Sequence, residues 1–497
     1  MGKVGSRRGA IAALFALGCV WYALLLAGGK SGFFPPPQSD LGLTFNSMLA
    51  RLPLGHFDVD PAAIGPEAIY QDGRAVAYFG IFCALIRWPL ALFPGGLSLN
   101  VTRISCLVAV CLAAFVKLKT LQFAASSRPA SPTGSFLFWP LALSILFAGP
   151  QIEFLNSSIY VEVCLWAAAL AAVFVYLGIR GLVRHRFSSA GLCGMAAVAG
   201  LALLCRVSTG VGLYAATGLL LLSMWLRGQP GSPPGDSGAG EARPEPATWR
   251  QVLWPVLLLG VSAALAGFVN YRRWGNPLLF ADYHNYALNG TYAERYARMQ
   301  ADGFFNLHRV PFGLLYYFLP IWVLRGQDGH LLFEAQQARW VPEQELPPSS
   351  FVATDPLFLF LLLYAAFSLA RRRSPAVDRA LAFPIGVGLA VPWVLLLSAI
   401  YTTLRYRLEF YPLLEFGGFV GFLLLWGTSR EEGSSRRLAA LARVSAAVGI
   451  VASHWTLFLS KLSEFGPAAD KLRGGVLAYY LLQIHQRVPR LGHWLPF

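Results

Sequence analysis

The chain begins MGKVGSRRGAIAALFALGCVWYALLLAGG (residues 1–29), a stretch in which three cations precede a long apolar run. The run is close to the ~20 residues needed to cross a bilayer, longer than the ~7 to 15 of a cleaved signal-peptide core. No A-x-A cleavage site follows it, so we expect a retained first membrane helix. Lys3, Arg7 and Arg8 place its start in the cytoplasm, because cytoplasmic ends of spans are enriched in Lys and Arg.

The composition extends this conclusion to the whole chain. Of the 497 residues, 56% are hydrophobic and 13% are charged, and the mean hydropathy is +0.53, which excludes a soluble globular protein. The net charge of +15 could indicate a nucleic-acid binder, but the cations fall in short clusters between apolar runs instead of along one face. The seven cysteines have no CxxC or CxxH spacing, so we interpret them as small core residues.

Apolar runs predict about eleven transmembrane helices in an all-α polytopic membrane protein. The runs lie at 10–29, 101–122, 135–150, 160–181, 189–205, 209–226, 251–270, 354–370, 380–400, 410–427 and 441–459. With a cytoplasmic N-terminus, every second loop should be rich in Lys and Arg, and the loops agree. The basic clusters are Lys117 and Lys119; Arg180, Arg184 and Arg186; Arg227, Arg243 and Arg250; Arg371, Arg372, Arg373 and Arg379; and Arg430, Arg436, Arg437 and Arg443.

This topology divides the chain into one multi-span domain, residues 1–459, and a short extracytoplasmic tail, 460–497. Within the multi-span domain we predict a first outer loop at 30–100, a Pro/Gly-rich disordered cytoplasmic linker at 227–249 and a second large outer loop at 271–353. Two apolar stretches, 76–95 and 308–324, carry arginine, proline and many aromatics. We predict interfacial helices there, because counting either as a span would invert the pattern of basic loops downstream.

Three charged residues stand at the edge of hydrocarbon, where an unpaired charge costs a few kcal/mol. They are Arg87 in FCALIRWPLALF, Glu162 in SSIYVEVCLW and Arg206 in LLCRVSTG. They predict a polar cavity. A lipid phosphate would suit the arginines, since a guanidinium binds phosphate oxygens in bidentate fashion and keeps its charge.

The stretch TTLRYRLEFYPLLEF, residues 402–416, repeats this pattern at the outer start of a late span. In an extended segment, Arg405, Arg407 and Glu409 would alternate onto one side, with Tyr411 at the mouth of the span. Pro412 suits the first turn of the following helix. The alternative is that these arginines only extend to the interface to reach water.

The first outer loop is long for a connection between two spans, which indicates a functional unit. It carries Asp40, an amphipathic helix near 41–52, and then Asp58 and Asp60. Carboxylates beside a membrane cavity suit general-base catalysis, in which an ionised Asp takes the proton of an attacking hydroxyl. Asp58 and Asp60 could instead be turn or cap residues before a helix that starts at Pro61.

The order of these features resembles the GT-C superfamily of polytopic membrane glycosyltransferases, including bacterial relatives of the lipid A aminoarabinose transferase and the protein mannosyltransferases. The resemblance rests on the first span, an acidic residue early in a large outer loop, the segment YFGIFCALIRWPL, and the NVTRIS that opens the next span. It covers the first ~200 residues best. Beyond them it depends on the multi-span layout and on RYRLEFYPLL.

The resemblance implies an inverting transfer of a sugar from a polyprenyl-phosphate donor to a lipid, glycan or protein acceptor. The reaction would take place on the periplasmic face of a bacterial inner membrane. By position, the family's base falls on Asp40. The sequence reads SDLG where the family has an Asp-Glu pair, so Asp58 and Asp60 remain alternatives. Arg74, Arg87, Arg405 and Arg407 would neutralise the leaving phosphate, and Glu162, Arg206 and Tyr411 would line the cavity or contact the acceptor.

We expect no cofactor and no tightly held metal, because the eight histidines show no HExxH or comparable spacing. Members of the family differ in metal use, so a divalent ion is the alternative. Two other functions fit the same residues. One is a transporter or flippase for a lipid-linked sugar, which would normally show internal repeats. The other is a non-catalytic subunit of an envelope-assembly complex. The segment 281–309 is either an acceptor-binding element or an interfacial helix.

Overall fold

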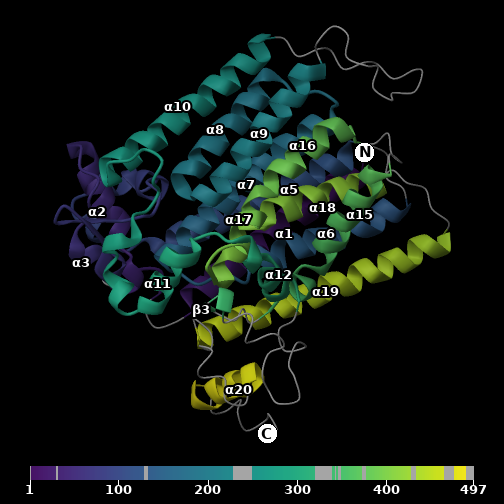
Figure 1. Ribbon diagram of the computed structural model, residues 1–497. Coiled ribbons are helices and arrows are strands. Elements are labelled where there is room, and N and C mark those ends of the chain that lie inside the picture. Colours follow the sequence, from purple (N-terminus) through teal and green to yellow (C-terminus); the bar gives the residue numbers. More distant parts are fainter. Residues whose placement is uncertain are drawn as a thin grey trace.

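The computed structural model of the chain describes residues 2–28, 32–37, 39–127, 132–227, 249–319, 339–341, 343–344, 349–371, 377–426, 432–463 and 475–487. In these ranges nearly all regular structure is helical, and the four strands are two or three residues long. The short helices of the outer loops, α2 (Thr44–Arg51), α3 (Pro61–Ile64) and α11 (Ala293–Asp302), gather at one end of a bundle, and the N-terminus lies at the other (Figure 1).

Among the described residues, seven helical stretches are long and apolar enough to cross a membrane. They are α1 (Gly2–Ala27), α5 (Thr102–Ser126), α7 (Ile159–Val183), α9 (Val207–Arg227), α10 (Trp249–Trp274), α16 (Arg379–Leu389) with α17 (Val391–Leu397), and α19 (Glu432–Leu462). Shorter apolar helices fill the remaining predicted positions. They are α6 (Pro132–Phe147), α8 (Ser189–Cys205), α15 (Pro356–Ala370) and α18 (Tyr411–Trp426). All eleven predicted runs are therefore helical, which confirms an all-α polytopic membrane protein; eleven as the number of spans stays a prediction.

One basic residue that we assigned to a cytoplasmic loop lies inside the bundle. α5 continues to Ser126, so Lys117 is within the helix, where its side chain is buried. Its Nζ is 2.5 Å from Oε1 of Glu415 in α18. The assignment of Lys117 to a loop was wrong. Its charge is neutralised inside the bundle by Glu415 of another helix, and apolar periodicity along one segment cannot reveal such a partner.

The centre of the bundle is α18, which is buried along almost its whole length. It packs against α15 and α7, while α5 packs on α7, and α8 lies between α9 and α10. The close approach of α18 and α15 depends on a glycine. A Cβ on Gly421 of α18 would lie 2.2 Å from the carbonyl oxygen of Leu361 in α15. By contrast, α1 and α10 turn large apolar side chains such as Leu24 and Val261 outward, as lipid-facing helices do.

The first outer loop forms a compact set of short elements. In addition to α2 and α3 it contains η1 (Ser39–Leu41), η2 (Leu52–Leu54), η3 (Gly65–Glu67), β1 (Ile69–Gln71), β2 (Arg74–Val76), α4 (Phe82–Leu85), η4 (Trp88–Leu92) and η5 (Gly96–Ser98). The strands form an antiparallel hairpin with Ile69 opposite Val76. The predicted amphipathic helix is α2. The apolar stretch 76–95 forms only α4 and η4, with Pro89 at the start of η4, so it is too short to cross a bilayer.

The second large outer loop also consists of short elements. It contains η7 (Tyr283–Asn285), η8 (Ala287–Gly290), α11, η9 (Leu307–Arg309), α12 (Val310–Phe318), β3 (Glu343–Gln344) and α14 (Phe351–Thr354), and β3 pairs with β4 (Tyr401–Thr402) just before η11 (Leu404–Glu409). The described part of the stretch 308–324 contains the last two residues of η9, α12 and Leu319. Most of the linker 227–249 lies outside the described residues, and the tail 460–497 contains α20 (Gly475–Arg487).

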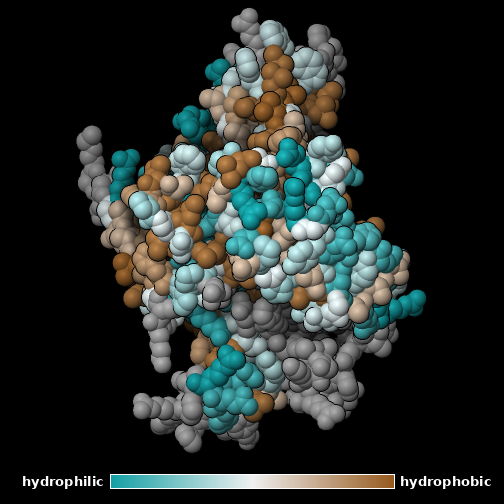
Figure 2. All heavy atoms as spheres, turned by 90° about the vertical axis from the view of Figure 1, so that its left-hand side faces the viewer, coloured by the Kyte–Doolittle hydropathy of each residue, from teal (hydrophilic) through white to brown (hydrophobic). Residues whose placement is uncertain are grey.

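The face built by the outer-loop elements differs from the sides of the bundle. Figure 2 shows hydrophilic side chains gathered over its centre, with apolar side chains above and beside them. A polar end next to apolar flanks is the arrangement expected where a bundle meets the membrane surface.

We predict that Gly421→Ala lowers the free energy of unfolding by about 1–3 kcal/mol, because the new methyl group overlaps the α15 backbone. The matched control is Gly218→Ala in α9, where a Cβ meets nothing within 4 Å and where Ala is intrinsically better in a helix. Thermal unfolding of both purified variants in detergent measures the difference. Equal melting temperatures would contradict the close approach of α15 and α18.

Candidate functional site

The first turns of α7 are the meeting point of the outer-loop elements. Ser158 caps the helix, since its Oγ accepts a hydrogen bond from the backbone N–H of Val161 (3.4 Å). Tyr160 packs its ring against Phe79 with centroids 5.8 Å apart. Glu162, fully buried, faces the first outer loop. Side chains from one helix start therefore hold the first outer loop.

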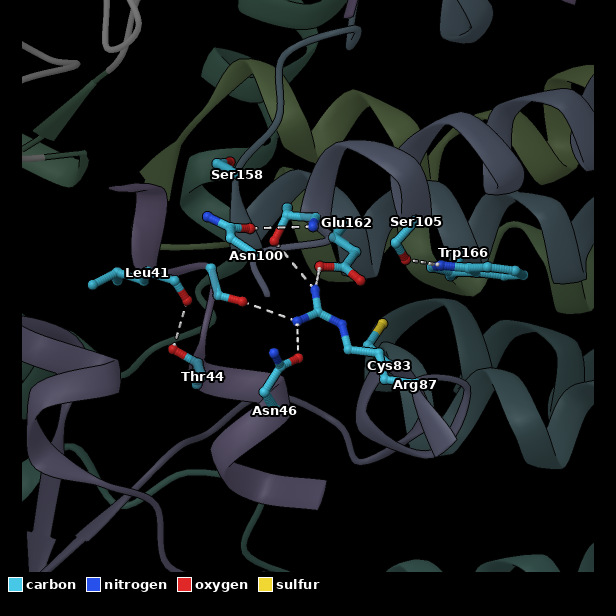
Figure 3. A network of polar contacts seen from close by, with 12 residues as sticks. Leu41, Thr44, Asn46, Cys83, Arg87, Asn100, Ser105, Ser158, Glu162 and Trp166 are labelled. Atoms are coloured by element: carbon cyan, nitrogen blue, oxygen red, sulfur yellow. Dashed lines mark hydrogen bonds and ion pairs between the residues drawn. The ribbon is translucent and has the colours of Figure 1, made fainter. Parts of the chain in front are cut away.

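Arg87 and Glu162 form a buried ion pair (Figure 3). Nη2 of Arg87 is 2.5 Å from Oε2 of Glu162 and 3.2 Å from Oγ1 of Thr102. Nη1 donates to the carbonyl oxygen of Gly42 (2.9 Å) and to Oδ1 of Asn46 (2.7 Å). Only 3% of Arg87 is exposed. The geometry thus gives Arg87, which we expected to bind phosphate, and Glu162, which we expected in a cavity, the role of positioning the outer loop.

The loop that carries Asp40 is held from two sides. Asn100 donates from Nδ2 to the carbonyl oxygens of Pro36 (3.2 Å) and Ser39 (3.1 Å), while Arg87 holds Gly42. Between these anchors Leu41 has φ of +55°, a left-handed conformation that costs a non-glycine residue of order 1–3 kcal/mol and clusters at functional sites. The backbone of Asp40 lies in η1, and its side chain is outside the described part of the chain.

The other two acidic candidates have local partners. Asp60 is the N-cap of α3, where its Oδ1 accepts a hydrogen bond from the N–H of Ala62 (2.9 Å). Asp58 forms an ion pair with Arg51. The cap assignment that we held as the alternative for Asp60 is thus the observed one. Arg74 stands exposed on the hairpin, opposite Gln71.

A second group of charged side chains surrounds the end of α8. Arg206 donates from Nε to Oε1 of Glu409 (2.8 Å), and the hydroxyl of Ser208 donates to the same carboxylate. Arg206 also lies over the ring of Tyr406 (5.4 Å), and Arg405 lies over the ring of Tyr160 (4.8 Å). The Arg206 side chain is 21% exposed, so this pair of cations is reachable from outside in a way that Arg87 is not.

Arg407 belongs to a third group, in which one cation lies between two buried carboxylates. Its Nη1 is 2.8 Å from Oε2 of Glu153 and its Nη2 is 3.7 Å from Oδ2 of Asp355. The hydroxyl of Tyr411 donates to Asp355 (2.7 Å) and to Glu153 (3.3 Å). Burial raises the pKa of Glu153 to about 7 against the opposing charge of Arg407, and it also raises the pKa of Asp355.

The expected alternation of Arg405, Arg407 and Glu409 in an extended strand is wrong. Residues 404–409 form η11, whose bonds run from the N–H of Tyr406 to the carbonyl of Thr403 and from Phe410 to Arg407. A helical turn sends neighbouring side chains to different sides. Arg405 and Glu409 therefore face the end of α8, whereas Arg407 faces Glu153 and Asp355.

An aromatic cluster with one buried acid was missed from the sequence. The hydroxyls of Tyr78 (2.9 Å) and Tyr286 (2.8 Å) both donate to Oε2 of Glu67, and the ring of Tyr283 stands against both tyrosines. Burial, followed by the charge of Glu67, raises the pKa of Tyr286. The signal lay in the tyrosine spacing of ADYHNYALNGTY (residues 281–292), part of the segment predicted to bind an acceptor or to lie in the interface.

An apolar groove of about 600 Å³ runs between α8, α9 and α10. Its lining includes Leu203, Val211, Phe268, Tyr271, Leu278 and Phe280. Leu203 lies three residues before Arg206, and Val211 lies three residues after Ser208. The groove and the Arg206–Glu409 pair therefore share neighbouring stretches of α8 and α9, although Arg206 and Glu409 do not line the groove.

The fold defines the class of the molecule: a polytopic helical membrane protein. In the described ranges, no group of three or more His, Cys, Asp or Glu side chains could hold a metal ion.

Comparison with known proteins gives distant similarities only. No family model and no curated protein sequence matches the chain. The apo oligosaccharyltransferase of Archaeoglobus fulgidus is similar with a TM-score of 0.44 and 13% identity over 95% of this chain and 59% of that one. ArnT of Cupriavidus metallidurans bound to undecaprenyl phosphate gives a TM-score of 0.41 and 13% identity over 90% and 75%. The chain thus spans about three fifths of the length of the oligosaccharyltransferase.

We predict that Arg87→Met destabilises the protein by about 3–5 kcal/mol, because it leaves the Glu162 carboxylate buried and unpaired. The double variant Arg87→Met with Glu162→Leu should recover much of this loss, since no buried charge remains. Arg227→Met is the matched control: its partner Asp378 is solvent-accessible, and exposed pairs contribute about 0–1 kcal/mol. If thermal unfolding shows that Arg87→Met loses no more stability than Arg227→Met, Arg87 does not anchor the first outer loop.

We predict that Glu153→Gln removes a pH dependence of stability. The pKa of Glu153 is raised from 4.5 to about 7 in the folded protein, so the folded state binds the proton more tightly than the unfolded state. The stabilisation is complete below pH 4.5 and is lost as pH rises through about 7. Melting temperatures across this window should fall more steeply for the wild type than for Glu153→Gln. Parallel curves would show that Glu153 is ionised throughout.

Proposed function

We propose that this protein is a glycosyltransferase that moves a sugar from a polyprenyl-phosphate-linked donor to a lipid, glycan or protein acceptor on the extracytoplasmic side of a membrane. The observation that carries the proposal is the apolar groove between α8, α9 and α10, whose lining residues Leu203 and Val211 lie three residues along the chain from Arg206 and Ser208. A polyprenyl phosphate has the matching shape, a long apolar chain with one anionic end. The groove would hold part of the chain and the guanidinium groups of Arg206 and Arg405 would face the phosphate.

The charges suit the leaving group of such a transfer. As the bond between the anomeric carbon and the phosphate oxygen breaks, negative charge grows on the phosphate. Positioned cations stabilise that charge more in the transition state than in the ground state, which is how they accelerate the step. Arg206 is kept in place by Glu409, and Arg405 by its position over Tyr160, so neither cation has to reorganise.

Asp40 is our choice for the general base. It would take the proton of the acceptor hydroxyl while that oxygen attacks the anomeric carbon and the polyprenyl phosphate leaves from the opposite face, with inversion. The support is that the loop around it is fixed at Pro36, Ser39 and Gly42 and contains the strained Leu41. Asp60 is a less suitable base because its carboxylate caps α3.

The remaining parts of the site would orient the sugar and acceptor. Tyr78, Tyr283 and Tyr286, with Glu67, offer aromatic faces and hydroxyls, the combination of apolar surface and few fixed polar groups that binding pockets use. In this arrangement Arg87, Glu162, Arg407 and Tyr411 hold the framework, and Arg74 lies apart on the hairpin.

The test is transfer of radiolabelled sugar from a polyprenyl-phosphate donor pool to endogenous acceptors, in membranes that carry each variant at equal level. Asp40→Asn should lower the transfer rate by about 10²-fold or more, the usual contribution of a general base. Asp60→Asn is the matched control, because Asn is also a good N-cap and should leave transfer unchanged.

Two outcomes would count against the proposal. If wild-type membranes label no acceptor above empty membranes with several donor sugars, the transferase function is wrong, and lipid-flipping assays follow. If Asp60→Asn abolishes labelling and Asp40→Asn does not, the transferase stands and the base is wrongly assigned.

A further inference from the structure

A second cavity, of about 620 Å³, lies where α1 ends and α5 begins. Three cations line it, each from a different helix: Arg103 from α5, Lys461 from α19 and Arg487 from α20. Asn156, Ser157 and Ser463 add polar groups. No residue of the groove between α8, α9 and α10 takes part, so this cationic pocket is a separate site.

Two of the three cations of the pocket, Arg103 and Lys461, contact neutral oxygens. Arg103 donates from Nε to Oγ of Ser157 (3.2 Å) and from Nη1 to the carbonyl oxygen of Gly32. Lys461 donates from Nζ to the carbonyl oxygen of Leu25 (2.5 Å). Among the lining residues that the structure describes, none is acidic. Three positive charges around one cavity repel one another, and a bound anion would offset this repulsion.

The position of the pocket indicates the depth in the membrane at which the anion would lie. Arg103 is in the first turn of the span in α5, and Lys461 is in the last turn of the span in α19. Both ends mark the boundary between hydrocarbon and the polar surface, which is the depth of lipid headgroups. Lys461 and Arg487 are exposed, so the cavity can be reached from that boundary.

We propose that the pocket binds a phosphate group, carried either by a membrane lipid or by a soluble phosphate. Arg103 and Arg487 can bind phosphate oxygens through their guanidinium forks, Lys461 supplies a point charge, and Ser157 and Ser463 supply hydroxyls. The proposal concerns binding alone and does not depend on sugar transfer by the site at the end of α8.

The test uses the purified full chain and two probes. Native mass spectrometry counts phosphatidylglycerol retained from nanodiscs of phosphatidylcholine with phosphatidylglycerol, and inorganic phosphate is titrated against the melting temperature in a neutral detergent. The variant is Lys461→Gln with Arg487→Gln, which changes exposed side chains only. Lys119→Gln, an exposed cation at the other end of α5, is the control.

The double variant should bind the responding probe about 10- to 100-fold more weakly than wild type, because it loses two charge-assisted contacts, and Lys119→Gln should bind as wild type does. Loss of phosphatidylglycerol supports a lipid headgroup, and loss of the phosphate response alone supports a soluble ligand. The proposal is overturned if the double variant binds both probes as wild type does, or if wild type binds neither. Sugar transfer measured on the same preparations reports on the other site separately.

Discussion

The buried ion pair between Arg87 and Glu162 is the constraint on which the outer end of the bundle depends. Each charge alone would be unstable at the edge of hydrocarbon, so the first outer loop can settle only where its arginine meets the acid of α7. The remaining donors of Arg87 then fix Gly42 and Asn46, and Asn100 fixes the chain just before them. One electrostatic requirement thereby determines the path of the loop that carries Asp40.

Three arginines of this end, Arg87, Arg407 and Arg206, fall into two kinds, and exposure separates them. Arg87 and Arg407 are 3% and 0% exposed, and their partners are buried acids, so removing them would strand a charge inside the protein. Arg206 is paired on one side and open on the other, with 21% of its side chain exposed. Buried pairs of the first kind make the framework stiff, and a stiff framework is what allows cations of the second kind to face a ligand without reorganising.

Much of the fold could be predicted from local features of the sequence. Apolar runs located all eleven main helices, Pro61 after Asp60 indicated a helix start, and the cost of charge in hydrocarbon marked Arg87, Glu162 and Arg206. The partners could not be predicted, because they are distant: Arg87 and Glu162 are 75 residues apart, and Arg206 and Glu409 are 203 apart. Apolar periodicity reports which face of a helix is buried, but it carries no information about which helix lies opposite. Lys117 was therefore predicted as a loop cation, and the stretch from Arg405 to Glu409 was predicted as extended although it forms the 3₁₀ helix η11.

The loop that carries Asp40 connects the two cationic regions of the molecule. On one side Arg103 of the cationic pocket holds the carbonyl of Gly32; on the other, Arg87 holds the carbonyl of Gly42 and leads through Glu162 to the start of α7. Tyr160, in the same turn of α7, supports Arg405. If the groove holds part of a polyprenyl phosphate, as proposed, a phosphate in the cationic pocket belongs to a different molecule, because the two cavities share no lining residue.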